Sequence, residues 1–364
     1  MLGERALNRA LLERQLLLQR AELPPLRAVG HLAGLQAQAP NAPYVGLWSR
    51  LADFRPAGLA DLLTGRAAVR THLMRNTVHL VTAADCLAWG GLFQAVHRQR
   101  FASSPFARNV DGADLAAVTE AGRGLLEQPR TRAELGRLLA ERWPDRDPAS
   151  LAYAVTHLVP TVQVPPRGIW GRTGPAAFTT TEAWLGGQAA PKAEPDRLVL
   201  RYLAAFGPAS VRDMQAWCGL TRLGEVAERL RPRLRVFRDA GGRELFDLPG
   251  APRPDPGTPA PPRFLPEYDN VLLSHADRSR IIPGRRSVPL PPGHGGSRGT
   301  VLVDGFWAAT WRVDRTDGGA VLRVEAFTPL GRGQADAVAA EAGRLLAFVA
   351  PDADTCDVQF DGPT

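Results

Sequence analysis

A recurring order of helix, helix, strand, turn and strand limits the folds open to this sequence more than any other feature. In the first copy, helices are expected from Tyr44 to Phe54 and from Pro56 to Gly65, and strands over residues 68–75 and 77–82. Proline near the start of a helix and glycine just after its end are common boundary signals. Helices followed by a hairpin in this order are typical of a winged helix, a fold that often binds DNA.

Two further copies of this order follow in the chain. Thr131 and Glu134 have the spacing of a capping box, which marks the start of a helix. The turn Asp239-Ala-Gly-Gly242 between alternating strands is a strong signal for a hairpin. The helices expected in these copies cover residues 114–126, 131–143, 197–206, 210–217 and 221–230, with another opening at Asp147, and the expected hairpins cover residues 161–181 and 234–247.

The repeats predict an α+β fold with three tandem winged-helix units and, at the C-terminal end, a β-rich section with a closing helix. In that last section, strands are expected over residues 301–303, 306–313 and 320–327, and the helix over residues 334–348. A chain of 364 residues is long enough for about two to four compact units. The expected units are residues 1–110, with an N-terminal helix over 4–20 and the first winged helix; 111–190 and 191–250, with the second and third; 251–262, a connector rich in proline and glycine; and 263–364.

The positive charge of the chain is concentrated in its first third. The net charge is +7; residues 1–110 hold 13 arginines and 6 acidic residues, whereas residues 111–364 hold 31 basic and 31 acidic residues. A basic region favours a polyanionic partner, because neutralising phosphates releases counterions. The charge therefore indicates a nucleic-acid partner. The alternative is that the charge reflects composition alone, since a high arginine content raises the isoelectric point whatever the protein does.

Several kinds of chemistry are difficult to build from these residues. Cys86, Cys218 and Cys356 are far apart and form no Cys-x-x-Cys pair, so neither a disulfide framework nor a zinc site is indicated, and no metal or cofactor is expected. Lys192 is the only lysine and lies in a presumed linker, which argues against Schiff-base or P-loop mechanisms. No apolar run reaches membrane-spanning length and no signal-peptide core is present, so a cytoplasmic, nucleoid-associated protein without a membrane partner is expected.

Two glutamines, Gln36 and Gln38, flank Ala37 in the basic region. Residues two apart share a face only in extended or irregular backbone, since on a helix they point about 200° apart. Pro40 biases Ala39 away from the helical conformation, which allows both amides to converge on one small molecule such as water. The alternative is that both are solvated polar side chains near the end of a helix.

Other polar residues are candidates for binding or support. The residues expected to contact DNA, with a solvated basic face as the alternative, are Arg70, His72, Arg75, Asn76, Arg98, Arg100 and Arg172. Four more cluster around Val271-Leu-Leu273 and are expected to form a hydrogen-bonded structural turn, with a catalytic carboxylate as the alternative: Asp269, Asn270, Asp277 and Arg278.

In their order along the chain, several motifs resemble those of the bacterial winged-helix DNA glycosylases typified by AlkZ, in particular the Gln-apolar-Gln type associated with antibiotic self-resistance. The motifs are Gln36-Ala37-Gln38 and the segments over residues 75–81, 164–172, 265–270 and 274–278. The resemblance implies a C-shaped basic channel, a monomer, and double-stranded DNA bearing alkylated guanine as the partner. It also implies hydrolysis of the N-glycosidic bond of N7-alkylguanine, the first step of base excision repair, and in some members the unhooking of interstrand cross-links. Gln36 and Gln38 would hold the attacking water.

The chemistry expected from the resemblance agrees with the residues present. An N7-alkylated guanine is cationic and already a good leaving group, so two neutral amides that orient water could suffice. The enzyme should then be poor on neutral damaged bases, and with Lys192 as the only lysine it should not cleave the strand at the abasic site. The alternative function is a non-catalytic winged-helix transcription regulator, because fold alone does not fix function.

Overall fold

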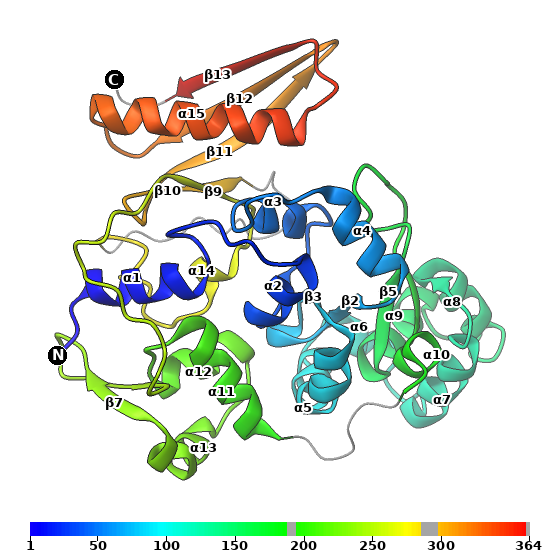
Figure 1. The fold of residues 1–364 in the computed structure, drawn as a ribbon. Coiled ribbons are helices and arrows are strands. Elements are labelled where there is room, and N and C mark those ends of the chain that lie inside the picture. The colour runs from blue at the N-terminus through cyan, green and yellow to red at the C-terminus, as the bar shows by residue number, and fades with distance from the viewer. Residues whose placement is uncertain (188–193, 285–297, 362–364) are drawn as a thin grey trace.

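The first copy of the repeated order lies at the centre of the molecule (Figure 1). The protein is described by a computed structural model that covers residues 1–187, 194–284 and 298–361. Two helices, two strands and their turn follow one another in the predicted order, whereas the helix that begins at Pro25 and the short strand after it were not predicted. The elements are α2 (Pro25–His31), β1 (Leu35–Gln36), α3 (Ala42–Trp48), α4 (Pro56–Thr64), β2 (Ala68–His72), the 3₁₀ turn η1 (Met74–Asn76) and β3 (Val78–Thr82).

The second copy lies to the right in Figure 1 and is reached through a long helix. Asp114, Thr131 and Asp147 cap the starts of its helices with their side chains, and Thr131 forms the predicted capping box with Glu134. The elements are α5 (Ala83–Ala102), α6 (Pro105–Asn109), α7 (Leu115–Leu125), β4 (Arg130–Thr131), α8 (Arg132–Ala140), α9 (Pro148–Leu158), β5 (Thr161–Val164), β6 (Ala177–Thr180) and α10 (Thr181–Leu185).

The third copy forms a separate helical group with its own two-stranded sheet, at the lower left of Figure 1. Ala209 makes an isolated antiparallel bridge to Phe246, in the place of the short first strand of the other copies. The elements are α11 (Pro195–Phe206), α12 (Val211–Cys218), α13 (Leu223–Leu230), the 3₁₀ turn η2 (Arg231–Arg233), β7 (Arg235–Arg238) and β8 (Glu244–Asp247).

One six-stranded sheet joins the first and second copies, in the strand order β1-β3-β2-β5-β6-β4. The junction is an antiparallel pair between β2 and β5, in which Arg70 lies opposite Gln163 and Thr71 opposite Val162. Residues on either side of the expected boundary at 110 therefore share hydrogen bonds. This arrangement brings the first hairpin directly beside the second, so side chains from both copies face one common surface.

The C-terminal section is a second sheet, of order β13-β12-β11-β10-β9, with α15 packed against it. The sequence analysis placed a closing helix here, but the chain continues after α15 into β13, which pairs in parallel with the edge of β12. Parallel pairing requires a crossover connection, and α15 provides it. The elements are β9 (Arg263–Leu265), α14 (Asn270–Leu273), β10 (Gly299–Val303), β11 (Phe306–Thr316), β12 (Gly319–Ala326), α15 (Arg332–Val349) and β13 (Thr355–Asp361).

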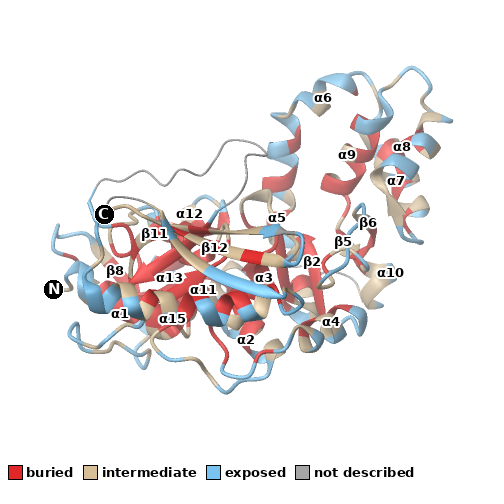
Figure 2. Cartoon of the chain, turned by 90° about the horizontal axis from the view of Figure 1, so that it is seen from above, coloured by how far each residue is buried: buried red, intermediate tan, exposed pale blue. Residues whose placement is uncertain are grey.

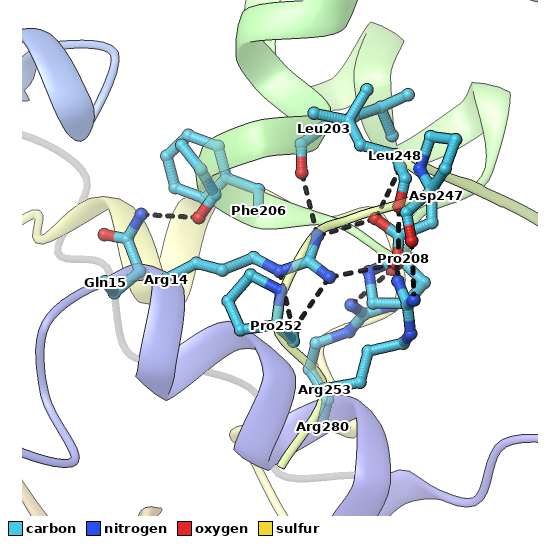
Figure 3. A network of polar contacts seen from close by, with 12 residues as sticks. Arg14, Gln15, Leu203, Phe206, Pro208, Asp247, Leu248, Pro252, Arg253 and Arg280 are labelled. Atoms are coloured by element: carbon cyan, nitrogen blue, oxygen red, sulfur yellow. Dashed lines mark hydrogen bonds and ion pairs between the residues drawn. The ribbon is translucent and has the colours of Figure 1, made fainter. Parts of the chain in front are cut away.

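The N-terminal helix α1 (Glu4–Arg14) connects the third copy to the C-terminal section. It is shorter than the expected 4–20, because the chain turns at Leu16, whose φ is +56°. Its leucines are buried, and Arg9 and Arg14 are buried as well. Arg14 forms two hydrogen bonds to the buried carboxylate of Asp247, at 2.7 and 2.9 Å, and Arg253 binds the same carboxylate (Figure 3).

The cores of these units follow the sheets and the inner sides of the helices. In Figure 2 the buried residues run along β2 and the inner side of α9, whereas α6 buries none of its residues. The largest cluster of buried apolar side chains combines residues of α1, β2, α5, α11 and α12, so the first and third copies share one core. The six-stranded sheet is therefore held from both sides, which fixes the positions of the side chains on it.

Candidate functional site

Gln36 is held at the edge of the six-stranded sheet. It lies in β1 opposite His79 of β3, and the pairing continues one residue further through a hydrogen bond from the Ala37 amide to the Val78 carbonyl, 2.7 Å. The side chain is buried, and its Oε1 accepts a hydrogen bond from Nη2 of Arg75 at 2.7 Å. Its amide is thus oriented by a cation rather than by solvent.

Arg75 occupies the turn between β2 and β3. Arg75 and Asn76 both have positive φ, 55° and 61°, which a tight hairpin turn requires. The guanidinium does not extend into solvent, because it binds Gln36 and the carbonyl of Trp217 in α12. Burial lowers the pKa of Arg75 to about 10, so the side chain remains cationic at neutral pH.

Gln38 lies in a different environment, just after the backbone bends. It is exposed, and its Oε1 accepts a hydrogen bond from the Val78 amide at 3.2 Å. It lines a cleft together with Arg70, His72 and Val78. Its amide is therefore fixed at one end and open to the cleft at the other.

The two glutamines are directed toward different faces of the sheet. Neighbouring residues of a strand point to opposite faces. Gln36 pairs with His79, whereas Val78, the residue before His79, lines the cleft beside Gln38. The extended backbone that would put residues 36 and 38 on one face ends at Ala37. In this structure the two amides thus have separate protein partners, and only Gln38 borders the cleft.

The cleft covers the junction of β2 and β5 and has a volume of about 520 Å³, within the roughly 300–1,000 Å³ range of small-molecule sites. Its walls come from both copies and from the start of α8. Three arginines border it and its described lining includes no acidic side chain, so the cleft is cationic. The lining residues are Gln38, Arg70, His72, Val78, Thr131, Arg132, Ala133, Gln163, Arg167, Pro175, Ala176 and Phe178.

Arg70 lies at the bottom of this cleft and is 2% exposed. Its Nη2 donates to the carbonyl of Ala37 at 2.9 Å, so it holds the backbone between the two glutamines. Burial, and then the charge of Arg167, lowers the pKa of Arg70 to about 10. Gly168 packs against the guanidinium, and a Cβ at this glycine would come within 2.5 Å of Nη1. Among the residues that the structure describes, Nε and Nη1 have no hydrogen-bond partner.

His72 begins a column of stacked rings behind the cleft. Its ring lies 4.8 Å from that of His157, which in turn lies 3.8 Å from the ring of Tyr153. Burial and the charge of Arg132 lower the pKa of His157 to about 3, and burial lowers that of His97, close by, to about 4. Burial also lowers the pKa of His79 to about 3. These histidines are neutral at pH 7 and support the sheet as uncharged groups.

The buried histidines predict a loss of stability in mild acid. Between their folded pKa values and the ordinary value near 6.5, the unfolded chain binds protons that the folded chain does not bind. Stability is therefore complete above pH 6.5 and falls as the pH drops toward 4, by about 1–2 kcal/mol per buried ring at pH 5. Urea unfolding at pH 7.5 and pH 5.0 measures this difference.

A matched variant identifies the residues responsible for this acid sensitivity. His157→Phe keeps a ring against Tyr153 but removes the titrating group, so we expect a smaller loss between pH 7.5 and 5.0 than in the wild type. Equal stability of the wild type at the two pH values would contradict the assignment, because most carboxylates titrate below this window.

The remaining expected DNA contacts differ in exposure. Asn76 is partly buried in the turn beside Arg75, while Arg98 and Arg100 lie exposed on the last turns of α5. Arg172 is exposed in the loop between β5 and β6. The structure thus brings Arg70 and His72 to the cleft, directs Arg75 to Gln36, and leaves Arg98, Arg100 and Arg172 on the surface.

The polar cluster after β9 has structural contacts. The Asp269 carboxylate caps α14 and makes two hydrogen bonds to the buried guanidinium of Arg50, at 2.8 and 2.9 Å. Asn270 donates to the carbonyl of Gly34, just before β1, at 3.0 Å. Asp277 pairs with Arg243, and Arg278 accepts backbone hydrogen bonds from the following turn. Asp269 and Asn270 therefore support the strand that carries Gln36.

Among the cleft residues that were not candidates in the sequence analysis, three have long polar side chains: Gln163, Arg132 and Arg167. Gln163 lies in β5, Arg132 opens α8 and Arg167 lies in the following loop. The available signal was a polar residue at position 163 between two valines of an expected strand. The pairing of β2 with β5 could not be read from the sequence, and it is this pairing that brings Gln163 beside Arg70.

Within residues 1–187, 194–284 and 298–361, no group of three or more His, Cys, Asp or Glu side chains is placed to hold a metal ion. In the same ranges, no helix combines the length and the apolar character needed to cross a bilayer. Lys192, the only lysine, lies outside the described residues.

Comparisons with known proteins agree on one family. The sequence model of the family described as "DNA glycosylase AlkZ-like" matches residues 29–348. Among solved structures, the DNA glycosylase AlkZ of Streptomyces sahachiroi is similar over 100% of both chains, with a TM-score of 0.78 and 20% sequence identity. No match is found among curated proteins. The structural similarity shows a common fold and agrees with the α+β class predicted from the sequence.

Proposed function

The chain belongs to the AlkZ-like DNA glycosylase family, and from this we propose that it is a monofunctional enzyme that removes N7-alkylguanine from double-stranded DNA. The observation that carries the proposal is the cationic cleft at the bend after Ala37, with Gln38 at its edge and Arg70 at its bottom. The cleft can receive one extruded nucleotide, and an enzyme that acts on a base within a duplex must extrude it.

The duplex would lie against exposed arginines at the end of α5 and in the loop between β5 and β6. We propose that the three copies of the repeated order are winged helices that together form a C-shaped channel, and that the protein acts as a monomer. Arg98, Arg100 and Arg172 would contact phosphates, because they are exposed and cationic. Such contacts position the protein without reading the sequence.

The reaction needs little help from the protein because the leaving group is already activated. Water attacks C1′ of the extruded nucleotide while the bond from C1′ to N9 breaks and its electron pair passes to the base. The cationic ring becomes neutral N7-alkylguanine, and the water loses one proton to solvent. The task of the protein is then to hold the water in line with the breaking bond.

Gln36 and Gln38 would hold that water. Gln38 meets it directly, because its carbonyl oxygen accepts one hydrogen bond from Val78 and has a second lone pair toward the cleft. Gln36 would reach the water only after its side chain turns away from Arg75, a rotamer change of the kind that binding commonly brings. A neutral amide deprotonates water poorly, so cationic lesions, including bulky N7 adducts and cross-links, would be preferred over neutral bases.

Incubation with a duplex that carries one N7-methylguanine tests this proposal. We expect the strand to stay intact until alkali is added and then to break at the lesion, because a Schiff base at the abasic site would require a lysine and the chain has only one, Lys192. Strand breakage without alkali would contradict the monofunctional mechanism. Binding without breakage even after alkali would instead favour a non-catalytic DNA-binding regulator.

A further inference from the structure

Two polar side chains at the bottom of the cleft have atoms without a partner. Arg70 and Gln163 lie directly opposite each other on β2 and β5, and both line the cleft. Nε and Nη1 of Arg70 and Oε1 of Gln163 are all buried, and none has a hydrogen-bond partner among the described residues. Buried groups of this kind are rare in proteins, because each costs free energy unless a ligand or water satisfies it.

Together these atoms define the ligand that would satisfy them. Arginine can only donate hydrogen bonds, so the atom facing Arg70 must be an acceptor. The atom facing Oε1 of Gln163 must be a donor. The site therefore needs an acceptor and a donor side by side.

Guanine presents this pair on its Watson–Crick edge, where O6 is an acceptor and the adjacent N1–H is a donor. Adenine presents the reverse, with an N6 amino donor next to the N1 acceptor. An adenine at the same place would set its amino group against the donors of Arg70 and leave them unsatisfied. Sites that hydrogen-bond one pattern reject the other strongly for this reason.

We propose that Arg70 and Gln163 read the Watson–Crick edge of the extruded base, Arg70 donating to O6 and Gln163 accepting from N1–H. This inference rests on the proposed function, because it assumes that a damaged base enters the cleft. It adds a preference of the enzyme for guanine over adenine, which Gln36 and Gln38 do not provide.

The burial of Arg70 favours a base over a phosphate as its ligand. Arg70 is 2% exposed and lies beneath Gly168, whereas the phosphates of a bound duplex stay at the protein surface. Arg132 and Arg167 are more exposed and border the same cleft, so they are better placed for the phosphates that flank an extruded nucleotide. Arg70 and Gln163 would then meet the base itself.

The charge of Arg70 also agrees with the reaction. Its pKa of about 10 leaves it cationic at neutral pH, so it repels the cationic ring of N7-alkylguanine before the reaction. The repulsion disappears as the electron pair moves to N9 and the base becomes neutral. An interaction that is better in the transition state than in the ground state raises the rate of the chemical step.

DNA treated with dimethyl sulfate tests the inference, because it carries both N7-methylguanine and N3-methyladenine. Single-turnover release of the two bases is measured for the wild type and for Gln163→Met, which keeps the length of the side chain but has no amide. We expect Gln163→Met to release N7-methylguanine about tenfold more slowly, the effect of one lost hydrogen bond to the base. We expect its affinity for undamaged duplex and its unfolding midpoint to match the wild type.

Arg167→Gln serves as the matched control, because it removes a cation from the edge of the same cleft. It should weaken binding to damaged and undamaged duplex alike and leave the ratio of the two released bases unchanged. Base reading by Gln163 is wrong if Gln163→Met, like the control, weakens binding to both duplexes and leaves the ratio of the two released bases unchanged. It is also wrong if Gln163→Met releases N7-methylguanine at the wild-type rate. If the wild type releases neither base, the proposed function fails first, and the two failures are thereby distinguished.

Discussion

Replacing Gln38 with alanine should lower the single-turnover rate of N7-methylguanine release by about 100-fold, the usual effect of losing the group that positions a reactant. Gln38 is exposed at the cleft, and within the described part of the chain its side chain has one hydrogen bond, accepted from the Val78 amide, so its removal should leave the fold intact. The rate is measured with saturating enzyme on a duplex that carries one N7-methylguanine, and folding is checked by urea unfolding.

Two further variants separate the contributions to this effect. Gln38→Glu keeps an oxygen acceptor at the same distance and should retain far more activity than Gln38→Ala. Arg75→Met releases Oε1 of Gln36 from its hydrogen bond and should change the rate only if Gln36 acts on the water. Wild-type rates in both Gln38→Ala and Gln36→Ala would remove the glutamine pair from the mechanism.

Replacing Asp247 with alanine should destabilise the protein by about 3–5 kcal/mol, the cost of leaving a buried charge without its partner. The carboxylate of Asp247 is fully buried and binds Arg14 through two hydrogen bonds and Arg253 through a third (Figure 3). Arg14 also donates to the carbonyls of Leu203 and Pro252. Loss of Asp247 therefore leaves the buried guanidinium of Arg14, and that of Arg253, without their carboxylate partner.

An exposed ion pair provides the comparison for this variant. Arg137 and Glu141 are 3.4 Å apart on the surface of α8, and Glu141→Ala should change the free energy of unfolding by about 0.5 kcal/mol or less. Urea unfolding at pH 7.5 measures both variants. Similar small effects in both would show that the network of Figure 3 does not hold α1 in place.

Local signals in the sequence predicted most of the helices and hairpins. Capping residues at Asp114, Thr131 and Asp147 mark the helix starts of the second copy, and each cap is present in the structure. The turn at residues 239–242 lies between β7 and β8, as its glycines predicted. These signals succeed because each depends on neighbours within a few residues of the chain.

Such local signals could not predict which distant strands and side chains pair with each other. Nothing local indicates that β2 pairs with β5, and this pair creates the cleft. Nothing near Arg14 in the sequence indicates that it is buried, because its partner is Asp247, a residue more than 200 positions away. The strand β13 was missed because it follows a helix that looked terminal. The candidate site was found in part: Gln38 and Arg70 were named, but Gln163 was not.

The most direct measurement of the central claim is release of the free base from two matched duplexes, one with a single N7-methylguanine and one with a neutral uracil at the same position. The released base is identified and counted by mass spectrometry. The account predicts release of N7-methylguanine with the strand left intact, and little or no release of uracil. Release of neither base, or of both at equal rates, would contradict a site that positions water for a cationic leaving group.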